Sequence, residues 1–161
     1  YGVARQFAQL EPGDTLLDLY CGMGTIGLSM AADCRELIGV EIIPEAVEGA
    51  ELNAAAMGAQ NARFFCADAG KAAAKLASEG LRPDVVCLDP PRKGCDEATL
   101  NAVITMGPRR IVMVSCNPAT AARDCRYLAD RGYTPLRAQP ADLFPRTKHC
   151  ECVIELVKQA D

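Results

Sequence analysis

Residues 15–27 read TLLDLYCGMGTIG, and they pass from a short apolar run through a glycine-rich turn into a helix-type pattern. The run Thr15–Leu19 predicts a β-strand, and the periodicity after the turn predicts a helix over Thr25–Ala32. The letters GMGTIG at 22–27 satisfy G-x-G-x-x-G, which indicates a turn where the backbone closely approaches a ligand. A strand, a glycine turn and a helix in this order predict the first unit of a wound α/β sheet.

The same alternation of strand and helix continues along the chain. We predict further strands at Leu37–Val40, Arg63–Cys66, Asp84–Leu88, Arg110–Ser115, Thr134–Gln139 and Glu151–Val157, and further helices at Pro44–Met57, Ala69–Ser78, Glu97–Met106 and Pro118–Asp130. Strands joined by helices require right-handed crossovers, which produce a parallel sheet covered on both faces. No helix separates the last two strands, so they are expected to pair antiparallel. The predicted fold class is a doubly wound, mostly parallel, seven-stranded α/β sheet.

Composition limits the possible classes. The 161 residues, half of them apolar and about a quarter charged, suit one domain spanning residues 1–161. No stretch approaches the roughly 18 consecutive apolar residues of a membrane span, and the start carries no signal-peptide pattern, so we expect a cytoplasmic protein without membrane partners. The nine cysteines are scattered without any C-x-x-C pair, which argues against a metal site and a disulfide framework. The net charge of −4 is unlike that of an autonomous nucleic-acid binder.

Four acidic residues follow the first four predicted strands: Asp18, Glu41, Asp68 and Asp89. The carboxyl ends of parallel strands form the ligand-binding edge of such a sheet. Carboxylates there would repel a pyrophosphate but suit S-adenosylmethionine, which carries a sulfonium and an ammonium group. Glu41 is placed to accept the ribose hydroxyls and Asp68 the adenine amine. Helix N-caps and loop solvation remain the structural alternatives for these residues, and an NAD-binding domain remains the alternative for the glycine turn.

The segment Asp89-Pro90-Pro91-Arg92 ends the fourth strand in a stiff loop. Similar D-P-P and N-P-P loops occur in base-modifying methyltransferases. In the amino-methylating members an aromatic residue takes the fourth position, whereas Arg92 and Lys93 follow here. This difference disfavours an exocyclic nitrogen target, although an amino-methyltransferase remains the alternative function.

Cys116 follows the fifth strand and precedes a helix, a position near a helix N-terminus that favours a thiolate. Uracil carbon 5 is a poor nucleophile, so its methylation requires a thiolate to add at carbon 6 first. A base must then remove the carbon 5 proton. Glu151 is the candidate base, because a last strand antiparallel to the fifth would begin beside Cys116. The structural alternatives are a small buried residue for Cys116 and an exposed strand carboxylate for Glu151, while His149 is left without a role.

Four motifs in order carry a resemblance to a known family: residues 18–24 (DLYCGMG), 89–94 (DPPRKG), 115–118 (SCNP), and Phe144-Pro145 with 149–153 (HCECV). With them the chain resembles the RNA 5-methyluridine methyltransferases over nearly its whole length. The resemblance implies a class I methyltransferase sheet with the seventh strand between the fifth and sixth.

The resemblance also implies roles for particular residues. Those expected to contact S-adenosylmethionine are Tyr20, Thr25, Glu41, Asp68 and Asp89; Cys116 is expected to be the nucleophile and Glu151 the proton acceptor. Members of this family are three-part proteins with RNA-binding domains, so we expect this chain to be the C-terminal catalytic part of a longer, monomeric protein. The expected substrate is a uridine in RNA, with ribosomal RNA favoured over transfer RNA. Arg92, Lys93, Arg146 and Lys148 would add a local basic edge.

Overall fold

The computed structural model describes residues 1–141 and 151–160. The helical elements are α1 (Gly2–Ala8), α2 (Thr25–Leu28), the 3₁₀ turn η1 (Ala31–Asp33), α3 (Pro44–Met57), α4 (Ala69–Ser78), α5 (Glu97–Met106) and α6 (Pro118–Ala129). The strands are β1 (Thr15–Leu19), β2 (Glu36–Glu41), β3 (Ala62–Cys66), β4 (Val85–Leu88), β5 (Arg110–Ser115), β6 (Tyr133–Ala141) and β7 (Glu151–Lys158). The predicted strands and crossover helices are therefore confirmed, with shifts of one or two residues at their ends.

The prediction of a continuous helix over Thr25–Ala32 is wrong. The α-helix ends at Leu28, and a separate 3₁₀ turn follows at Ala31–Asp33. The side chain of Asn61, thirty residues away, donates to the carbonyl of Ala31 at 2.8 Å and to that of Cys34 at 3.0 Å. These carbonyls are bound to a distant side chain, so a tertiary contact overrides the helical periodicity of the segment.

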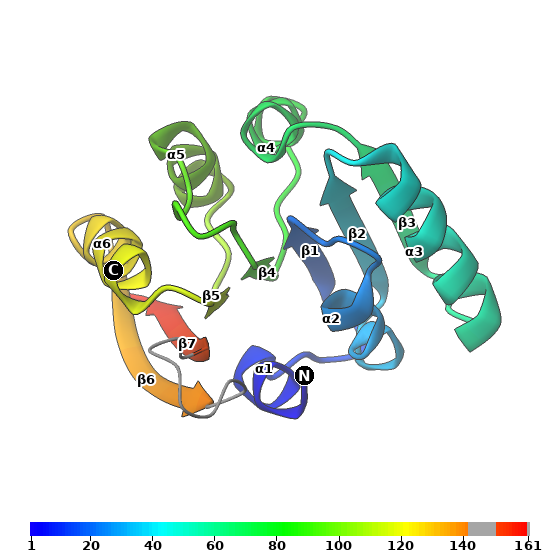
Figure 1. The fold of residues 1–161 in the computed structure, drawn as a ribbon. Helices are drawn as coiled ribbons and strands as arrows, with labels where there is room; N and C mark the ends of the chain where they lie inside the picture. The colour runs from blue at the N-terminus through cyan, green and yellow to red at the C-terminus, as the bar shows by residue number, and fades with distance from the viewer. Residues whose placement is uncertain (142–150, 161) are drawn as a thin grey trace.

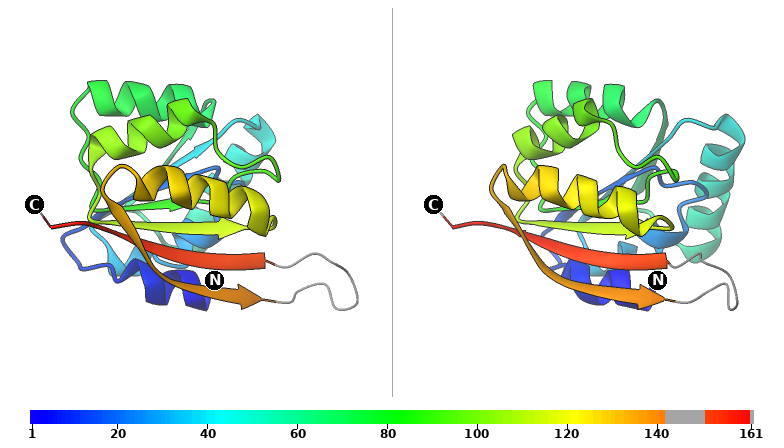
Figure 2. Two further views of the ribbon diagram at one scale, coloured as in Figure 1. Left: turned by 90° about the vertical axis from the view of Figure 1, so that its left-hand side faces the viewer. Right: turned by 60° about the vertical axis from the view of Figure 1, so that its left-hand side comes forward.

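The seven strands lie in the order β3-β2-β1-β4-β5-β7-β6. Strands β1 to β5 pair parallel, whereas β7 pairs antiparallel with both β5 and β6. Both views of Figure 2 show β7 lying beside β6 with the opposite direction. The order confirms the doubly wound fold and the place of the seventh strand between the fifth and sixth, which together define the class I methyltransferase sheet.

Helices cover both faces of the sheet (Figure 1). Alternate residues of each central strand point to opposite faces. In β1, Leu17 and Leu19 pack with α4, α5 and α6, while Leu16 packs with α1, α2 and α3. The core strands are buried at nearly every position, as expected for parallel strands covered twice. This rigid frame fixes the carboxyl ends of β1, β4 and β5, where the candidate residues lie.

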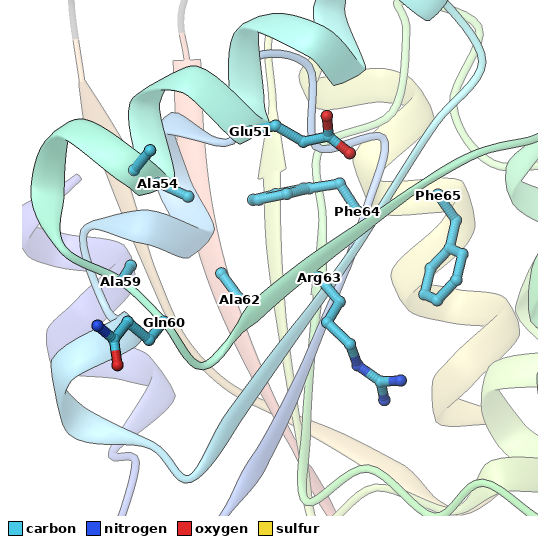
Figure 3. Close-up of a pocket in the computed structure, with 9 residues that line it drawn as sticks. Glu51, Ala54, Ala59, Gln60, Ala62, Arg63, Phe64 and Phe65 are labelled. Atoms are coloured by element: carbon cyan, nitrogen blue, oxygen red, sulfur yellow. The ribbon is translucent and has the colours of Figure 1, made fainter.

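The two edges of the sheet are more exposed. Strand β6 is exposed over most of its length and contains Pro135 and Pro140. Proline has no backbone N–H to donate to a neighbouring strand, and an edge strand tolerates this because one of its sides is unpaired. At the other edge a cavity of about 510 Å³ lies between α3 and β3, and Figure 3 shows Phe64 on the side of the helix and Phe65 on the opposite side of the strand.

Over residues 1–141 and 151–160, every helix is too short or too polar to cross a bilayer.

Candidate active site

The glycine turn is built around a buried carboxylate. Asp18 is 1% exposed, and its Oδ2 accepts a hydrogen bond of 3.0 Å from the backbone N–H of Gly27. A Cβ atom at Gly27 would lie 2.6 Å from that same oxygen, so only glycine fits this approach. Burial raises the pKa of Asp18 to about 7; the Gly27 hydrogen bond opposes this shift, and the charges of Asp89 and Glu41 add to it.

Glu41 holds the other side of the turn. Its Oε2 accepts from the N–H of Gly22 at 2.9 Å, and its Oε1 accepts from Ile42 at 2.8 Å and from Ile43 at 3.0 Å. Gly22 and Gly24 have φ angles of 54° and 79°, a region that favours glycine. One carboxylate therefore fixes the turn after β1 to the loop after β2.

A cavity of about 230 Å³ opens at this turn. Its lining comes from the start of the chain, the end of β1, the glycine turn and the end of β4: Tyr1, Asp18, Tyr20, Cys21, Gly22, Met23, Thr25, Ile26 and Asp89. The second oxygen of Asp18, Oδ1, is buried and has no hydrogen-bond partner within the part of the chain that the structure describes. An unsatisfied carboxylate oxygen beside a glycine cradle suits a ligand with a cationic donor, as S-adenosylmethionine has in its ammonium group. These residues therefore fit that cofactor.

Other predicted cofactor residues have structural partners. Tyr20 has a φ of 64°, its hydroxyl donates to Oγ1 of Thr99 on α5 at 3.3 Å, and it packs against the core while also contributing to the cavity lining. Asp68 caps α4 by accepting from the N–H of Lys71 at 3.0 Å, which is the structural alternative anticipated from the sequence. Thr25 is exposed at the cavity. The cofactor roles of these three residues stay predictions.

Asp89 is linked both to this cavity and to the start of β7. It follows β4 directly and lines the same cavity as the glycine turn. Burial raises its pKa to about 6, and the nearby charge of Glu151 adds to the shift. A carboxylate from β7 is therefore electrostatically coupled to one at the end of β4.

The ends of β5 and β7 that carry the two candidate residues lie side by side. Ser115 lies opposite Cys152 in the antiparallel register, and this is the last pair before Cys116 and Glu151. Continuing that register by one residue would set Cys116 opposite Glu151, so their proximity stays a prediction. Cys116 directly precedes Asn117, whose side chain caps α6 by accepting from the N–H of Ala119 at 3.2 Å. Cys116 is partly exposed, unlike most of the other cysteines that the structure describes.

Some predicted features lie outside the described residues: the motif Phe144-Pro145, His149, and the basic Arg146 and Lys148. Within residues 1–141 and 151–160, no group of three His, Cys, Asp or Glu side chains is arranged to hold a metal ion. The sequence analysis did not predict the unpartnered oxygen of Asp18, because a strand pattern does not reveal which groups donate hydrogen bonds to a buried carboxylate.

Comparisons with known proteins agree with this geometry. The family profile described as tRNA (uracil-5-)-methyltransferase matches residues 4–159. An uncharacterized RNA methyltransferase from Oceanobacillus iheyensis is 47% identical over 156 residues, which are 97% of this chain and 34% of that protein. The chain thus spans about a third of the length of the curated relatives it matches.

Solved structures show the same fold. The tRNA (uracil-54, C5)-methyltransferase of Pyrococcus abyssi, solved with S-adenosyl-L-homocysteine, has a TM-score of 0.82 and 31% identity over 97% of this chain and 37% of that one. A precorrin-6y C5,15-methyltransferase from Geobacter metallireducens has a TM-score of 0.81 with 16% identity, over 98% of this chain and 86% of that one, which supports the fold alone. The glycine turn, the sheet order and these matches lead to one conclusion: the chain belongs to the tRNA (uracil-5-)-methyltransferase family of S-adenosylmethionine-dependent enzymes.

Proposed function

We propose that this domain methylates carbon 5 of a uridine in RNA, with Cys116 as the nucleophile and Glu151 as the base. The observation that carries the proposal is the β5–β7 register, which aligns Ser115 with Cys152; extended by one residue, it supports a position of Cys116 beside Glu151. Both residues lie at the strand ends near Asp89, which also lines the cofactor cavity. A nucleophile and a base on one side of a methyl donor are what this reaction requires.

The steps follow from uracil chemistry. The thiolate of Cys116 adds to carbon 6, and the electron pair of the 5,6 double bond makes carbon 5 nucleophilic. When bound, S-adenosylmethionine would supply the electrophilic methyl group on its sulfonium; carbon 5 would take that methyl group, and breakage of the sulfur–methyl bond would leave S-adenosylhomocysteine. Glu151 then removes the proton from carbon 5, the double bond reforms, and the Cys116 sulfur leaves as a thiolate. Asp18 and Glu41 hold the glycine turn where the cofactor binds.

Two substitutions in the full-length gene product test the two roles separately. Cys116→Ala should abolish methylation and also the covalent trapping of RNA that contains 5-fluorouridine. Glu151→Gln should still form the bond to carbon 6 but fail to release it, so a protein–RNA adduct should accumulate on unmodified RNA. Undiminished turnover by Cys116→Ala would refute the proposal.

The alternative function is amino-methylation of an exocyclic nitrogen, which the D-P-P loop at 89–91 favours. Cys116 would then be structural. Product analysis by mass spectrometry distinguishes the two, because the methyl group would lie on nitrogen rather than on carbon 5.

The RNA target belongs to the proposal as well. We propose ribosomal RNA as the substrate class, bound largely by parts of a longer, monomeric, cytoplasmic protein of which residues 1–161 are the catalytic domain. The family profile and the Pyrococcus enzyme carry transfer RNA in their names, so both classes must be analysed. Mass spectrometry of ribosomal and transfer RNA from cells lacking the gene should show loss of one 5-methyluridine. The molar mass of the full-length protein, measured by light scattering, tests whether it is a monomer.

A further inference from the structure

One face of α6 binds the loop that follows Asp89. The Nδ2 of Asn117 and the Oγ1 of Thr120 both donate to the carbonyl of Arg92, at 2.9 Å and 3.2 Å. Thr120 lies three residues after Asn117, and Arg123 and Asp124 lie three and four residues after Thr120, so all of them lie near one side of the helix. The helix that begins beside Cys116 is thereby attached to the loop that leaves Asp89.

Arg123 and Asp124 form the tightest part of this contact. The Nη2 of Arg123 donates to the carbonyls of Lys93 and Cys95, both at 3.0 Å. Asp124 is 1% exposed; its Oδ2 accepts from the N–H of Cys95 at 2.8 Å, and its Oδ1 accepts from Nε and Nη2 of Arg123 at 2.8 Å and 2.7 Å. The contacts that Arg123 and Asp124 make to the loop cross 28 to 30 residues of sequence.

The loop is shaped to this pair. Gly94 has a φ of 79°, and a Cβ atom there would lie 2.5 Å from Nη2 of Arg123 and 2.6 Å from Oδ2 of Asp124. The N–H of Gly94 donates to the carbonyl of Pro91 at 2.8 Å, which closes the turn. The backbone of the loop therefore lies against the two side chains more closely than any residue but glycine allows.

The chemistry of the pair suits positioning better than simple stabilisation. The carboxylate of Asp124 is buried and loses much of its hydration, and replacing buried charges by apolar residues of similar size is often neutral or stabilising. The carboxylate and guanidinium instead satisfy one N–H and two carbonyls of a specific loop, which fixes its position along the helix axis as well as its distance. Asp89 and Cys116 lie at the two ends of this arrangement.

We propose that Arg123 and Asp124 are positioning residues, which hold residues 92–95 on α6 and so fix Asp89 relative to the Cys116 nucleophile during methyl transfer. The inference rests on the proposed function. Neither residue is assigned contact with the reacting atoms. They act by setting the distance between Asp89 and Cys116.

Asp124→Asn in the full-length protein is the first test. An amide has one acceptor oxygen, so either the N–H of Cys95 or the guanidinium of Arg123 would face an NH₂ group. Rates are normalised to enzyme that binds S-adenosylhomocysteine, which removes any loss due to unfolding. Because misplacement by about 1 Å can cost on the order of 100-fold in rate, we expect the normalised kcat to fall by roughly that factor, with a smaller change in KM for S-adenosylmethionine.

Matched variants separate positioning from general stability. Arg126→Ala removes an exposed arginine of the same helix, which pairs with Asp130 at 2.9 Å, and should leave the normalised kcat unchanged. Arg123→Lys keeps a charged donor within reach of the loop and should retain more activity than Arg123→Met. Gly94→Ala disturbs the same contact from the loop side, and it replaces Asp124→Asn if that variant fails to fold.

The outcomes are distinct. A wild-type normalised kcat in Asp124→Asn would overturn the positioning role and leave the proposed function intact. If Asp124→Asn does not fold, a wild-type normalised kcat in Gly94→Ala has the same meaning. Equal activity of Arg123→Lys and Arg123→Met would also count against it. If the unaltered protein does not methylate uridine, the proposed function fails and this inference falls with it.

Discussion

The two halves of the site are built in opposite ways. In the cofactor half, the carboxylates of Asp18 and Glu41 bind backbone N–H groups of the glycine turn and the adjoining loop. In the proposed reacting half, Asp89 follows β4 and Glu151 begins β7, and the charge of Glu151 adds to the rise that burial causes in the pKa of Asp89. The acidic residues at the strand ends are therefore of two kinds: Asp18 and Glu41 bind backbone N–H groups, whereas Asp89 is buried and interacts electrostatically with Glu151.

This contrast teaches that a carboxylate at a strand end can serve a ligand indirectly. Glu41 accepts three backbone hydrogen bonds, so its observed effect is to hold the glycine turn to the loop after β2. Asp18 keeps one oxygen for Gly27 and leaves the other buried beside the cavity. Substitutions in the two halves should accordingly change different quantities: binding and folding in the first, proton transfer in the second.

The largest expected effect comes from Glu41→Gln. Glutamine has one acceptor oxygen in place of two, so the turn and the loop after β2 cannot both stay bound. Losing charge-assisted hydrogen bonds worth about 1.5–3 kcal/mol each should weaken binding of S-adenosylhomocysteine by about 100-fold in calorimetry of the full-length protein. Glu48→Gln, an exposed position on α3, is the matched control, and a similar loss in that variant would contradict the account.

Gly27→Ala should destabilise the fold. Its Cβ would lie 2.6 Å from Asp18 Oδ2 and 2.9 Å from a methyl carbon of Leu37, so the core must shift. Overpacking of this kind costs about 1–3 kcal/mol in the free energy of unfolding, measured by urea denaturation. Gly13→Ala meets nothing within 4 Å and should not lose stability; equal losses in both variants would show that the close approach is unimportant.

Asp18 should make stability depend on pH. Its folded pKa of about 7 lies above the ordinary value of 3.8, so between these values the unfolded chain ionises while the folded protein keeps the proton. The unfolded state then binds fewer protons, and the free energy of unfolding should fall as pH rises, by about 1–2 kcal/mol between pH 5 and 7. Asp18→Asn should flatten this slope and Asp130→Asn, an exposed control, should preserve it. An unchanged slope in Asp18→Asn would argue that the carboxyl titrates normally.

The smallest expected effect is on Asp89. Its pKa of about 6 is raised first by burial and second by Glu151, so Glu151→Gln should lower it only partly, by less than about one unit. Carboxyl-carbon NMR titration of Asp89 in the two proteins measures the shift. No change would mean that the two carboxylates are not coupled.

Sequence periodicity predicted most of the sheet. Buried runs such as Val85–Leu88 and Arg110–Ser115 are strands in the structure, and the absence of a helix before β7 correctly indicated its antiparallel pairing. The same topology led to the prediction that Glu151 lies beside Cys116, and the Ser115–Cys152 pair is consistent with it. These features follow from local patterns and from the few ways in which wound sheets connect.

Other features depend on contacts that no local pattern encodes. The break after Leu28 goes with the hydrogen bonds of Asn61, and the positive φ of Tyr20 accompanies a bond to Thr99 on α5. The attachment of residues 92–95 to Arg123 and Asp124 joins segments about thirty residues apart. Such long-range side-chain contacts become visible only when the elements are placed in space.

Peptide mapping of the trapped complex tests the central claim most directly. The full-length protein is incubated with S-adenosylmethionine and RNA that contains 5-fluorouridine, digested, and sequenced by tandem mass spectrometry. The account predicts a modified pyrimidine on the peptide that contains Cys116. A modified pyrimidine on a different cysteine, such as Cys21 or Cys152, or methylation of ordinary RNA without any adduct, would contradict it.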